Sequence, residues 1–449
     1  MAKYKAYPDY KDSGVEWFDV KPSSWKVTRL KLETLISMGQ SPSSDDCNIE
    51  GDGWAFLQGN AEFGKVNPIE KQYCPVAKKI ANPGDILFSV RAPVGAINLA
   101  DKNYGIGRGL CSIAASENVT SPFLWWLLPT YKYQLDAIAT GSTFEAVSAE
   151  QLGNLCFALP SFSEQSQIVA FLDHETAKID NLIEKQQQLI ELLKEKRQAV
   201  ISHAVTKGLN PDVPMKDSGI EWLGEVPAHW TIAQLKFNTI EMQTGPFGSQ
   251  LHAEDYVVDG IPLINPAHMN AGIIIPDPKV TVDETTQERL RRHKLSEGEI
   301  IFSRRGELGR CAVVKKNNEG WLCGTGSMRA KLKKKIIPDY AYTLISSEGV
   351  VSELTLESKG STMANLNTET LGRIRLPVPP SSEQEAILGY IKIISDKYDY
   401  LIRSAVTAIR FMEERRTALI SAAVTGKIDV RDWVAPDTQK AEKPEETAV

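Results

Sequence analysis

Residues 11–17 read Lys-Asp-Ser-Gly-Val-Glu-Trp, and residues 216–222 read Lys-Asp-Ser-Gly-Ile-Glu-Trp. This repeat decides the fold, because later landmarks follow it in the same order in both halves of the chain. The offset between partners grows from 205 residues (Lys11 to Lys216) to 219 residues (Ser163 to Ser382). Solenoid and propeller repeats are only about 20 to 50 residues long. Each half is therefore domain-sized, and the chain is predicted to perform the same kind of task twice.

The composition is that of a soluble globular protein. The chain has 449 residues, 42% of them hydrophobic and 24% charged, which is enough for two to four domains with their own cores. No apolar run approaches the roughly 18 residues of a membrane helix, and no signal segment follows the first residues. The six cysteines lack the spacing of a zinc site or a disulfide framework. We expect a cytoplasmic protein with no metal site and no membrane contact.

Each half changes character once. Its first part is rich in glycine, proline and short β-branched or aromatic runs, which are typical of strands joined by turns. Its second part, from Ser163 to about Lys207 and from Ser382 to about Lys427, has no proline and almost no glycine. Each of these second parts is predicted to form one long helix.

Both predicted helices carry a heptad pattern. Steps of four and three give one seam in each helix, and such seams are typical of coiled coils. The first seam comprises Ile168, Leu172, Glu175, Ile179, Leu182, Gln186, Leu189, Leu193, Lys196 and Val200. The second comprises Ile387, Ile391, Ile394, Tyr398, Leu401, Ala405, Ala408, Met412, Arg415 and Leu419. We expect the helices to pair antiparallel; the alternative is that each packs only on its own globular region.

The predicted fold class is therefore α+β: two pseudo-repeated α/β globular regions separated by two long helices that form an antiparallel coiled coil. The expected parts are a first globular region (1–160), the first helix with its linker (161–214), a second globular region (215–379) and the second helix (380–430). A polar, acidic tail (431–449) has nothing to bury and is expected to be disordered.

Charge and motifs indicate a binding protein rather than an enzyme. The net charge is −6, but residues 299–335 hold ten basic residues against three acidic ones. A local basic segment can attract nucleic acid even though the net charge of the whole chain is negative. The sequence has no phosphate-binding loop, no His-Glu-x-x-His and no nucleophile elbow. We expect no catalytic residues in this chain.

Several motifs resemble those of one family. The repeated Asp-Ser-Gly-x-Glu-Trp segment, followed by proline and tryptophan, resembles the start of a target-recognition region in the specificity subunits of type I restriction-modification enzymes. Leu159-Pro160 leading to Ser163-Glu164-Gln165, and Pro377-Val378-Pro379 leading to Ser382-Glu383-Gln384, resemble the start of that family's long helices. The similarity covers about residues 10 to 430.

The resemblance implies a division of labour. Each globular region would be a target-recognition domain that reads one half of a split double-stranded DNA sequence. The paired helices would measure the unread spacer and dock two modification (methyltransferase) subunits, which restriction subunits would join. The complex would be a site-specific endonuclease and adenine methyltransferase. S-adenosylmethionine, ATP and Mg would bind to the partner subunits, and this chain would hold no cofactor.

Sequence readout needs Arg, Lys, Asn or Gln at base edges and small polar groups at phosphates. Loops with these residues lie at matching places in the two halves, and an alternative for each is a solvated surface group, a turn or a helix cap. The candidate DNA-binding residues are Arg91, Arg108, Ser142 and Thr143 in the first half, and Ser249, Gln250, Arg304, Arg305, Arg310, Lys359, Ser361 and Thr362 in the second.

Two other functions stay open on the sequence alone. One is a non-enzymatic, duplicated coiled-coil adaptor that binds two proteins and shows no sequence-selective DNA binding. The other is a fused enzyme with a hidden nuclease or methyltransferase, against which the missing motifs count.

Overall fold

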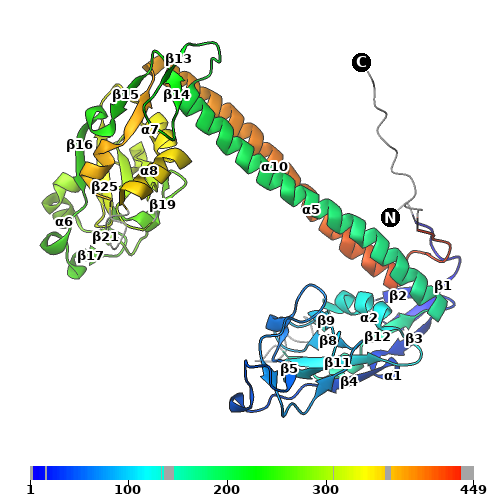
Figure 1. Cartoon of the computed structure of the whole chain (residues 1–449). Coiled ribbons are helices and arrows are strands. Elements are labelled where there is room, and N and C mark those ends of the chain that lie inside the picture. The colour runs from blue at the N-terminus through cyan, green and yellow to red at the C-terminus, as the bar shows by residue number, and fades with distance from the viewer. Residues whose placement is uncertain are drawn as a thin grey trace, which may run out of the picture. The chain divides into compact units, whose positions relative to one another are not determined.

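The structure is a computed structural model, and it describes residues 4–15, 18–132, 134–135, 146–306, 308–358 and 366–435. The chain forms two compact units (Figure 1). Unit 1 comprises residues 1–187 and 406–449, and unit 2 comprises residues 188–405. The two long helices are thus divided between the units, whereas the sequence assigned them to separate segments.

The elements of the first half are β1 (Tyr10–Val15), β2 (Phe18–Pro22), β3 (Lys26–Arg29), α1 (Leu30–Glu33), β4 (Thr34–Met38), β5 (Trp54–Leu57), β6 (Tyr73–Cys74), β7 (Ile80–Ala81), β8 (Ile86–Ser89), β9 (Ile97–Leu99), β10 (Tyr104–Ile106), β11 (Leu110–Ala115), α2 (Ser121–Leu127), α4 (Ala149–Gly153), β12 (Cys156–Leu159) and the long helix α5 (Phe162–Lys207). Short 3-10 helices are η1 (Ser44–Asp46), η2 (Asn60–Glu62) and η3 (Leu128–Tyr131).

The elements of the second half are β13 (Met215–Asp217), β14 (Glu225–Pro227), β15 (Thr231–Gln234), η4 (Leu235–Asn238), β16 (Thr239–Thr244), β17 (Tyr256–Val257), β18 (Ile261–Ile264), β19 (Met269–Asn270), β20 (Ile273–Ile274), β21 (Thr281–Val282), α6 (Glu284–Arg289), β22 (Ile300–Ser303), β23 (Cys311–Val313), β24 (Leu322–Cys323), β25 (Ser327–Leu332), α7 (Pro338–Ile345), α8 (Glu348–Ser358), α9 (Thr368–Arg373), β26 (Arg375–Val378) and α10 (Ser381–Val424). Short 3-10 helices are η5 (Gly248–Gln250), η6 (Ala253–Asp255), η7 (Pro266–His268), η8 (Arg291–His293) and η9 (Lys316–Asn318).

The same sheets occur in both units. Unit 1 has an antiparallel sheet of order β4-β11-β8-β9, and unit 2 has one of order β16-β25-β22-β23. Each unit adds a second four-stranded sheet with one parallel pair, β5 with β10 in unit 1 and β18 with β24 in unit 2. A hairpin precedes each copy, β1–β2 and β13–β14. The predicted fold class is confirmed.

One repeated landmark explains how each central strand starts. Gly84 and Gly298 have φ values of 90° and 83°, a left-handed conformation that glycine adopts without strain. The following acid closes the turn: Asp85 accepts a hydrogen bond from Asn82 N at 2.9 Å, and Glu299 accepts one from Ser296 N at 3.2 Å. The chain then enters the fully buried strands β8 and β22.

A buried glutamine anchors the start of each long helix. Gln165 donates to Pro160 O and Asn118 O and accepts from Thr120 N, at 3.1, 2.9 and 2.9 Å. Gln384 donates to Pro379 O and Lys335 O and accepts from Ile337 N, at 2.8, 3.0 and 2.8 Å. This amide therefore ties α5 to the start of α2, and α10 to the start of α7, by the same three bonds.

The helices pair antiparallel within each unit. In unit 1, Arg416 of α10 binds Asp180 of α5 at 2.8 Å, and in unit 2, Arg197 of α5 binds Asp399 of α10 at 2.7 Å. The four residues are partners across the repeat, since both arginines and both aspartates are 219 positions apart. The predicted pairing is therefore confirmed within each unit, with equivalent ion pairs.

One row of each predicted seam is right at its first residue, Ile168 or Ile387, which is completely buried, and lies one residue too early farther along the helix. The row of Leu172, Ile179, Gln186, Leu193 and Val200 is buried or half-buried as predicted. In the other row Leu182 and Leu189 are exposed, while Ile183 and Ile190 face the core; likewise Leu401 is exposed and Ile402 is half-buried. The error arose because apolar residues are adjacent at these points, so steps of four and three could not choose between them.

The residues after α10 pack against unit 1. Arg431 and Trp433, which the sequence assigned to the disordered tail, contact Asp429 and Phe171 respectively. The rest of that tail, residues 436–449, lies outside the described residues. Among the described helices, none is both long and apolar enough to cross a membrane.

Candidate functional site

In each unit, loops from both sheets meet at a contact between two glycines. Gly39, after β4, donates to Leu110 O at 2.9 Å, and Gly245, after β16, donates to Ser327 O at 2.9 Å. A Cβ atom on Gly39 would overlap the carbonyl oxygen of Gly107, and one on Gly245 would overlap that of Gly324. Only glycine allows the two backbones to approach so closely.

The first loop cluster comprises residues 39–43, 58, 89–91 and 107–109. Ser41 Oγ accepts hydrogen bonds from Arg108 N at 3.1 Å and from Gln58 Nε2 at 3.2 Å. A backbone bond from Val90 N to Gly109 O, 3.0 Å long, attaches the loop that carries Arg91. Arg91 and Arg108 are both exposed. The cluster thus places two cations beside small polar groups on one edge of unit 1.

The second loop cluster comprises residues 245–250, 265–266, 304–306, 308–310 and 324–326. Arg304 N donates to Gly326 O at 2.8 Å, and Gly326 N donates to Asn265 Oδ1 at 3.1 Å. Arg310 Nη1 donates to Pro266 O at 3.3 Å, so part of its guanidinium is held against the loop. Arg305 is exposed.

Ser249 and Gln250 lie on an exposed loop of the second cluster. Gln250 Oε1 accepts from Phe247 N at 3.2 Å, which closes a short turn. Arg289 fixes the turn from outside, since it donates to Gln250 O at 2.7 Å and pairs with Asp255 at 2.6 Å. The corresponding loop of unit 1 leaves its sheet through the equivalent glycine, Gly39.

Arg91 and Arg305 are structural equivalents. Ser89 Oγ donates to Arg91 O at 2.9 Å, and Ser303 Oγ donates to Arg305 O at 2.7 Å. The same serine therefore caps the same bend after the central strand in both units. That these arginines touch DNA stays a prediction.

Five predicted residues cannot be placed. Ser142, Thr143, Lys359, Ser361 and Thr362 lie outside the described residues. Among the other candidates, Arg91 and Arg108 share the first loop cluster, and Ser249, Gln250, Arg304, Arg305 and Arg310 share the second. The prediction missed Gln58, which no local sequence signal marks, and assigned no role to Ser41 or Asn265.

The basic segment 299–335 is partly neutralised by its own fold. Arg329, at the centre of the sheet of unit 2, is 8% exposed and pairs with Glu299 at 2.8 Å and Glu241 at 2.9 Å. Burial raises the pKa of Glu299, and the Arg329 charge opposes that shift. Lys315 pairs with Asp339 at 2.6 Å. Part of the positive charge of this segment is therefore paired with carboxylates, and less of it than the net charge suggests can attract a nucleic acid.

Acid–base and metal chemistry find little support among the described side chains. None of their His, Cys, Asp and Glu residues form a group of three or more that could hold a metal ion. Burial raises the pKa of Cys111, Cys311 and Cys323 to about 12, so these thiols stay protonated at neutral pH.

Known proteins share both the sequence pattern and the fold. A family model described as "Type I restriction modification DNA specificity domain" matches residues 22–192 and 240–402. The putative type I restriction enzyme MjaX specificity subunit of Methanocaldococcus jannaschii is 39% identical over 181 residues, which cover 39% of this chain and 42% of that protein. The type I restriction enzyme EcoBI specificity subunit of Escherichia coli is 22% identical over 92% of this chain and 88% of its own length.

Two solved structures share the fold. The HsdS subunit from Thermoanaerobacter tengcongensis aligns with a TM-score of 0.53 at 17% identity, covering 91% of this chain and 98% of that one. A chain from a study of complex assembly and conformational transition of the type I R-M system aligns with a TM-score of 0.66 at 17% identity, covering 91% and 99%. With two matched regions that span most of its length, the chain belongs to the type I restriction-modification DNA specificity family, as a specificity subunit.

Proposed function

We propose that each unit reads one half of a split DNA target through its loop cluster. The observation that carries this proposal is the pair of loop clusters, which share a main-chain frame and differ in side chains. Arg91 and Arg305 stand at the same place in the two clusters. The other polar side chains differ, with Ser41 and Gln58 in unit 1 and Asn265 and Arg310 in unit 2. The same frame can thus present a different set of donors and acceptors to each half-site.

The long helices would set the unread spacer. They have 46 and 44 residues, and each contributes to both units. The equivalent ion pairs Arg416–Asp180 and Arg197–Asp399 support a fixed register between the helices. In this proposal the number of unread base pairs depends on the length of both helices together.

Methyltransferase and restriction subunits would supply the chemistry. Specificity subunits are non-catalytic DNA-recognition subunits, so the endonuclease and adenine methyltransferase activities, with S-adenosylmethionine, ATP and Mg, would reside on partners in the cytoplasm. The chain would bind two copies of the methyltransferase subunit, because each unit carries an equivalent exposed apolar surface. Leu32 and Leu35 in unit 1, and their repeat partners Phe237 and Ile240 in unit 2, are all exposed large apolar side chains.

Methylation mapping tests the proposal. The chain would be co-expressed with its methyltransferase partner, and methylated adenines would be mapped across a genome. We expect one split motif with a fixed gap, in which exchange of residues 10–160 for those of a relative changes one half and exchange of residues 215–379 changes the other.

Two outcomes would contradict the proposal. An assembled complex that binds S-adenosylmethionine but methylates no adenine would favour the adaptor function. A domain exchange that alters both halves of the motif would contradict the assignment of one half-site to each unit.

A further inference from the structure

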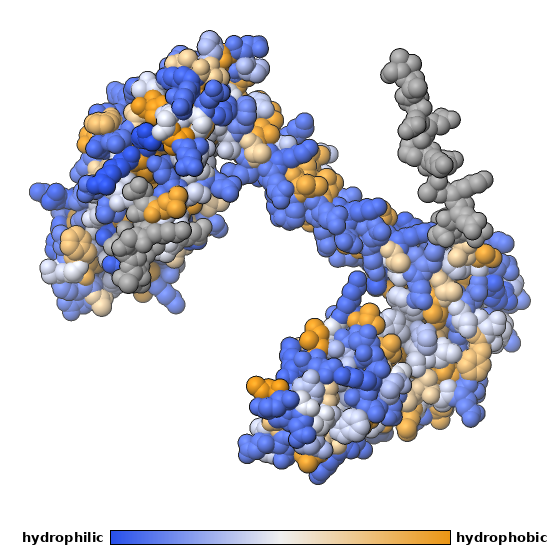
Figure 2. Space-filling view, viewed as in Figure 1, coloured by the Kyte–Doolittle hydropathy of each residue, from blue (hydrophilic) through white to orange (hydrophobic). Residues whose placement is uncertain are grey.

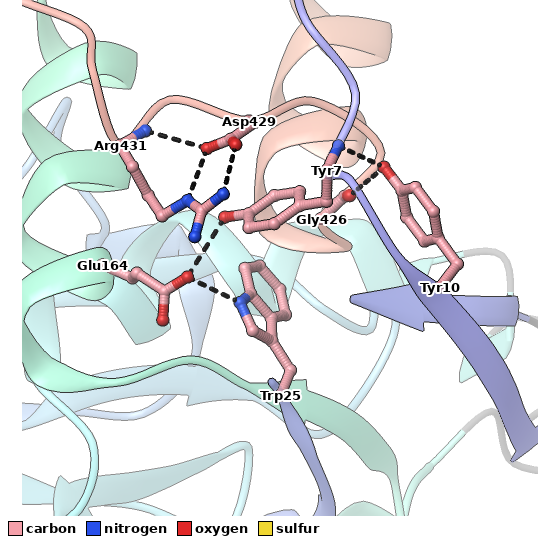
Figure 3. A network of polar contacts seen from close by, with 7 residues as sticks. All are labelled: Tyr7, Tyr10, Trp25, Glu164, Gly426, Asp429 and Arg431. Carbon is pink, nitrogen blue, oxygen red and sulfur yellow. Dashed lines mark hydrogen bonds and ion pairs between the residues drawn. The ribbon is translucent and has the colours of Figure 1, made fainter. Parts of the chain in front are cut away.

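In unit 1, a segment near the N-terminus (residues 4–10) contacts a segment that follows α10 (residues 426–433) (Figure 3). Tyr10 donates from its hydroxyl to Gly426 O at 3.0 Å, just beyond α10. Arg431 binds Asp429 through two nitrogens, at 2.9 and 2.7 Å, and its guanidinium lies 4.8 Å from the centre of the Tyr7 ring. The cation–π contact between Arg431 and Tyr7 and the hydrogen bond between Tyr10 and Gly426 therefore join the N-terminal and C-terminal segments.

The same network reaches the start of α5. Glu164 accepts hydrogen bonds from Trp25 Nε1 at 3.1 Å and from the Tyr7 hydroxyl at 3.4 Å (Figure 3). Both end segments are thus attached to the first turn of this helix.

The end segments also cover the side of α5 in unit 1. Phe171 meets the rings of Tyr4 and Trp433 edge-on, with centroid distances of 5.2 and 5.5 Å. Tyr4 donates to Glu175 at 3.0 Å, and the Trp433 ring lies 5.2 Å from that of His174. Phe171 is completely buried as a result.

The equivalent face of unit 2 is open. Tyr390 and Ile393 are the repeat partners of Phe171 and His174, each 219 positions later. Tyr390 is 38% exposed and Ile393 is 68% exposed. Tyr390 borders a cavity of about 930 Å³, whose lining includes Val200, His203, Leu209, Met215 and Glu225. Hydrophobic patches lie on the surface of the paired helices near their β13 end (Figure 2).

Chain connectivity explains the difference. In unit 2, residues 208–214 run directly from α5 to β13. In unit 1 no such direct connection joins the equivalent elements, and two separate segments, residues 4–9 and 425–435, take its place. The short connection of unit 2 brings no aromatic side chain to Tyr390, since it reads Gly-Leu-Asn-Pro-Asp-Val-Pro.

We propose that this cavity of unit 2 receives an extended segment of the methyltransferase subunit, which places an aromatic side chain against Tyr390 and Ile393. The inference rests on the proposed function for the identity of the partner. Unit 1 indicates that the occupant is a peptide with an aromatic side chain, because polypeptide that carries Tyr4 and Trp433 fills the equivalent space there. Aromatic rings attract one another beyond the area that they bury, and apolar patches of this kind mark interaction sites.

The rim suits a peptide. His203 and Glu225 are exposed at the cavity, where they can pair with peptide N–H and C=O groups. A second copy of this chain is a poorer occupant, because its own Tyr4 and Trp433 would first have to leave the contacts that bury Phe171.

Binding measurements with a charged variant test the inference. The double variant Tyr390→Lys/Ile393→Lys would be titrated with purified methyltransferase subunit, with subunit stoichiometry followed by native mass spectrometry. We expect the affinity for one of the two copies to fall at least tenfold. The control is Tyr400→Lys on the same helix, at a residue that is 65% exposed and outside the cavity lining, and it should bind like the wild type.

A crosslink at the same position gives a second readout. With p-benzoylphenylalanine at position 390, light should join the chain to a peptide of the methyltransferase subunit that contains Tyr, Trp or Phe. Unchanged affinity in the double variant, together with no crosslink in an assembled and methylating complex, would overturn this inference alone. Failure of the wild-type chain to bind the methyltransferase subunit would instead overturn the proposed function.

Discussion

One buried position of the central sheet is uncharged in unit 1 and charged in unit 2. Strand β11 of unit 1 places the small Ser112 opposite Leu87, whereas β25 of unit 2 places Arg329 opposite Ile301. Arg329 binds two carboxylates, Glu241 and Glu299, whereas the uncharged Ser112 of unit 1 needs no ionic partner. The same strand order therefore tolerates either a neutral or an ionic interior. The units nevertheless share their glycine contacts, the turns before their central strands, the buried glutamines that anchor the long helices and the ion pairs between those helices.

Replacement of Arg329 should have the largest effect on this comparison. The change Arg329→Met leaves Glu299, only 2% exposed, as a buried charge without its partner. Loss of one member of a buried ion pair costs about 3 to 5 kcal/mol of unfolding free energy. Urea unfolding of the full chain should show unit 2 weakened by that amount, whereas the matched change Ser112→Ala in unit 1 should have little effect.

The double variant Arg329→Met/Glu299→Gln sharpens that test. It removes both charges, so it should recover most of the lost stability. If it is no more stable than Arg329→Met, the cost comes from packing around the arginine rather than from an unpaired carboxylate.

The helix-anchoring glutamines should show where the units are alike. Gln165→Ala and Gln384→Ala each leave a buried N–H and two carbonyl groups without their amide partner, which costs about 2 to 3 kcal/mol. The two losses in unfolding free energy should agree closely, because the three bonds are the same. A large loss in one unit only would show that the two helix starts are not energetically equivalent.

The loop arginines should separate the two half-sites. Arg91→Ala is expected to weaken binding at one half of the DNA target and Arg305→Ala at the other, each by about 1 to 3 kcal/mol if the side chain reads a base. Binding of the assembled complex to targets with one altered half would measure this. A loss that is equal for all sequences, with a lower salt dependence, would indicate a phosphate contact instead.

The ion pairs between the helices should contribute less. Both are half-exposed, and such pairs contribute up to about 1 kcal/mol. Arg416→Asp should destabilise unit 1 and Arg197→Asp should destabilise unit 2, and the exchanges Arg416→Asp/Asp180→Arg and Arg197→Asp/Asp399→Arg should restore each unit. Unfolding curves of the single and exchanged variants measure both steps, and no recovery would contradict the antiparallel register.

Acid should slightly weaken the contact between residues 4–10 and 426–433 of unit 1, which lowers the free energy of unfolding. The hydrogen bonds from Arg431 lower the pKa of Asp429 below its usual value. A lowered folded-state pKa gives stability that is present above the unfolded pKa, about 3.9, and is lost as pH falls through the folded value. Wild type and Asp429→Asn should therefore differ in unfolding free energy near neutral pH and converge in acid. A constant difference would contradict this role.

Much of this architecture could be predicted from the sequence. The repeated landmarks gave the two units, because glycine, proline and capping residues mark turns locally. The heptads gave the paired helices, but not which of two adjacent apolar residues, such as Leu182 and Ile183, faces the core. That choice depends on the partner helix, which a single helical pattern does not contain.

The site was less predictable for the same reason. Arg91 and Arg305 were matched from their strands, and the structure gives them the same bend. The ion pairs of Arg329 escaped prediction, because its partners Glu241 and Glu299 come from other strands. The close contacts of Gly39 and Gly245 could not be predicted, because they are made with Gly107 and Gly324, which follow other strands.

The division of the helices between the units also sets the order in which the protein can be completed during synthesis. Unit 2 is one continuous segment, residues 188–405, so all of its contacts are available before the chain is finished. Unit 1 begins first but needs residues from 406 onward to cover its core. The residues that complete that core lie at positions 419–430, so at a synthesis rate of about 5 to 20 residues per second they follow residue 405 by roughly 1 to 5 s. Unit 2 can therefore complete its contacts first, and the oldest segment of the chain is the last to close.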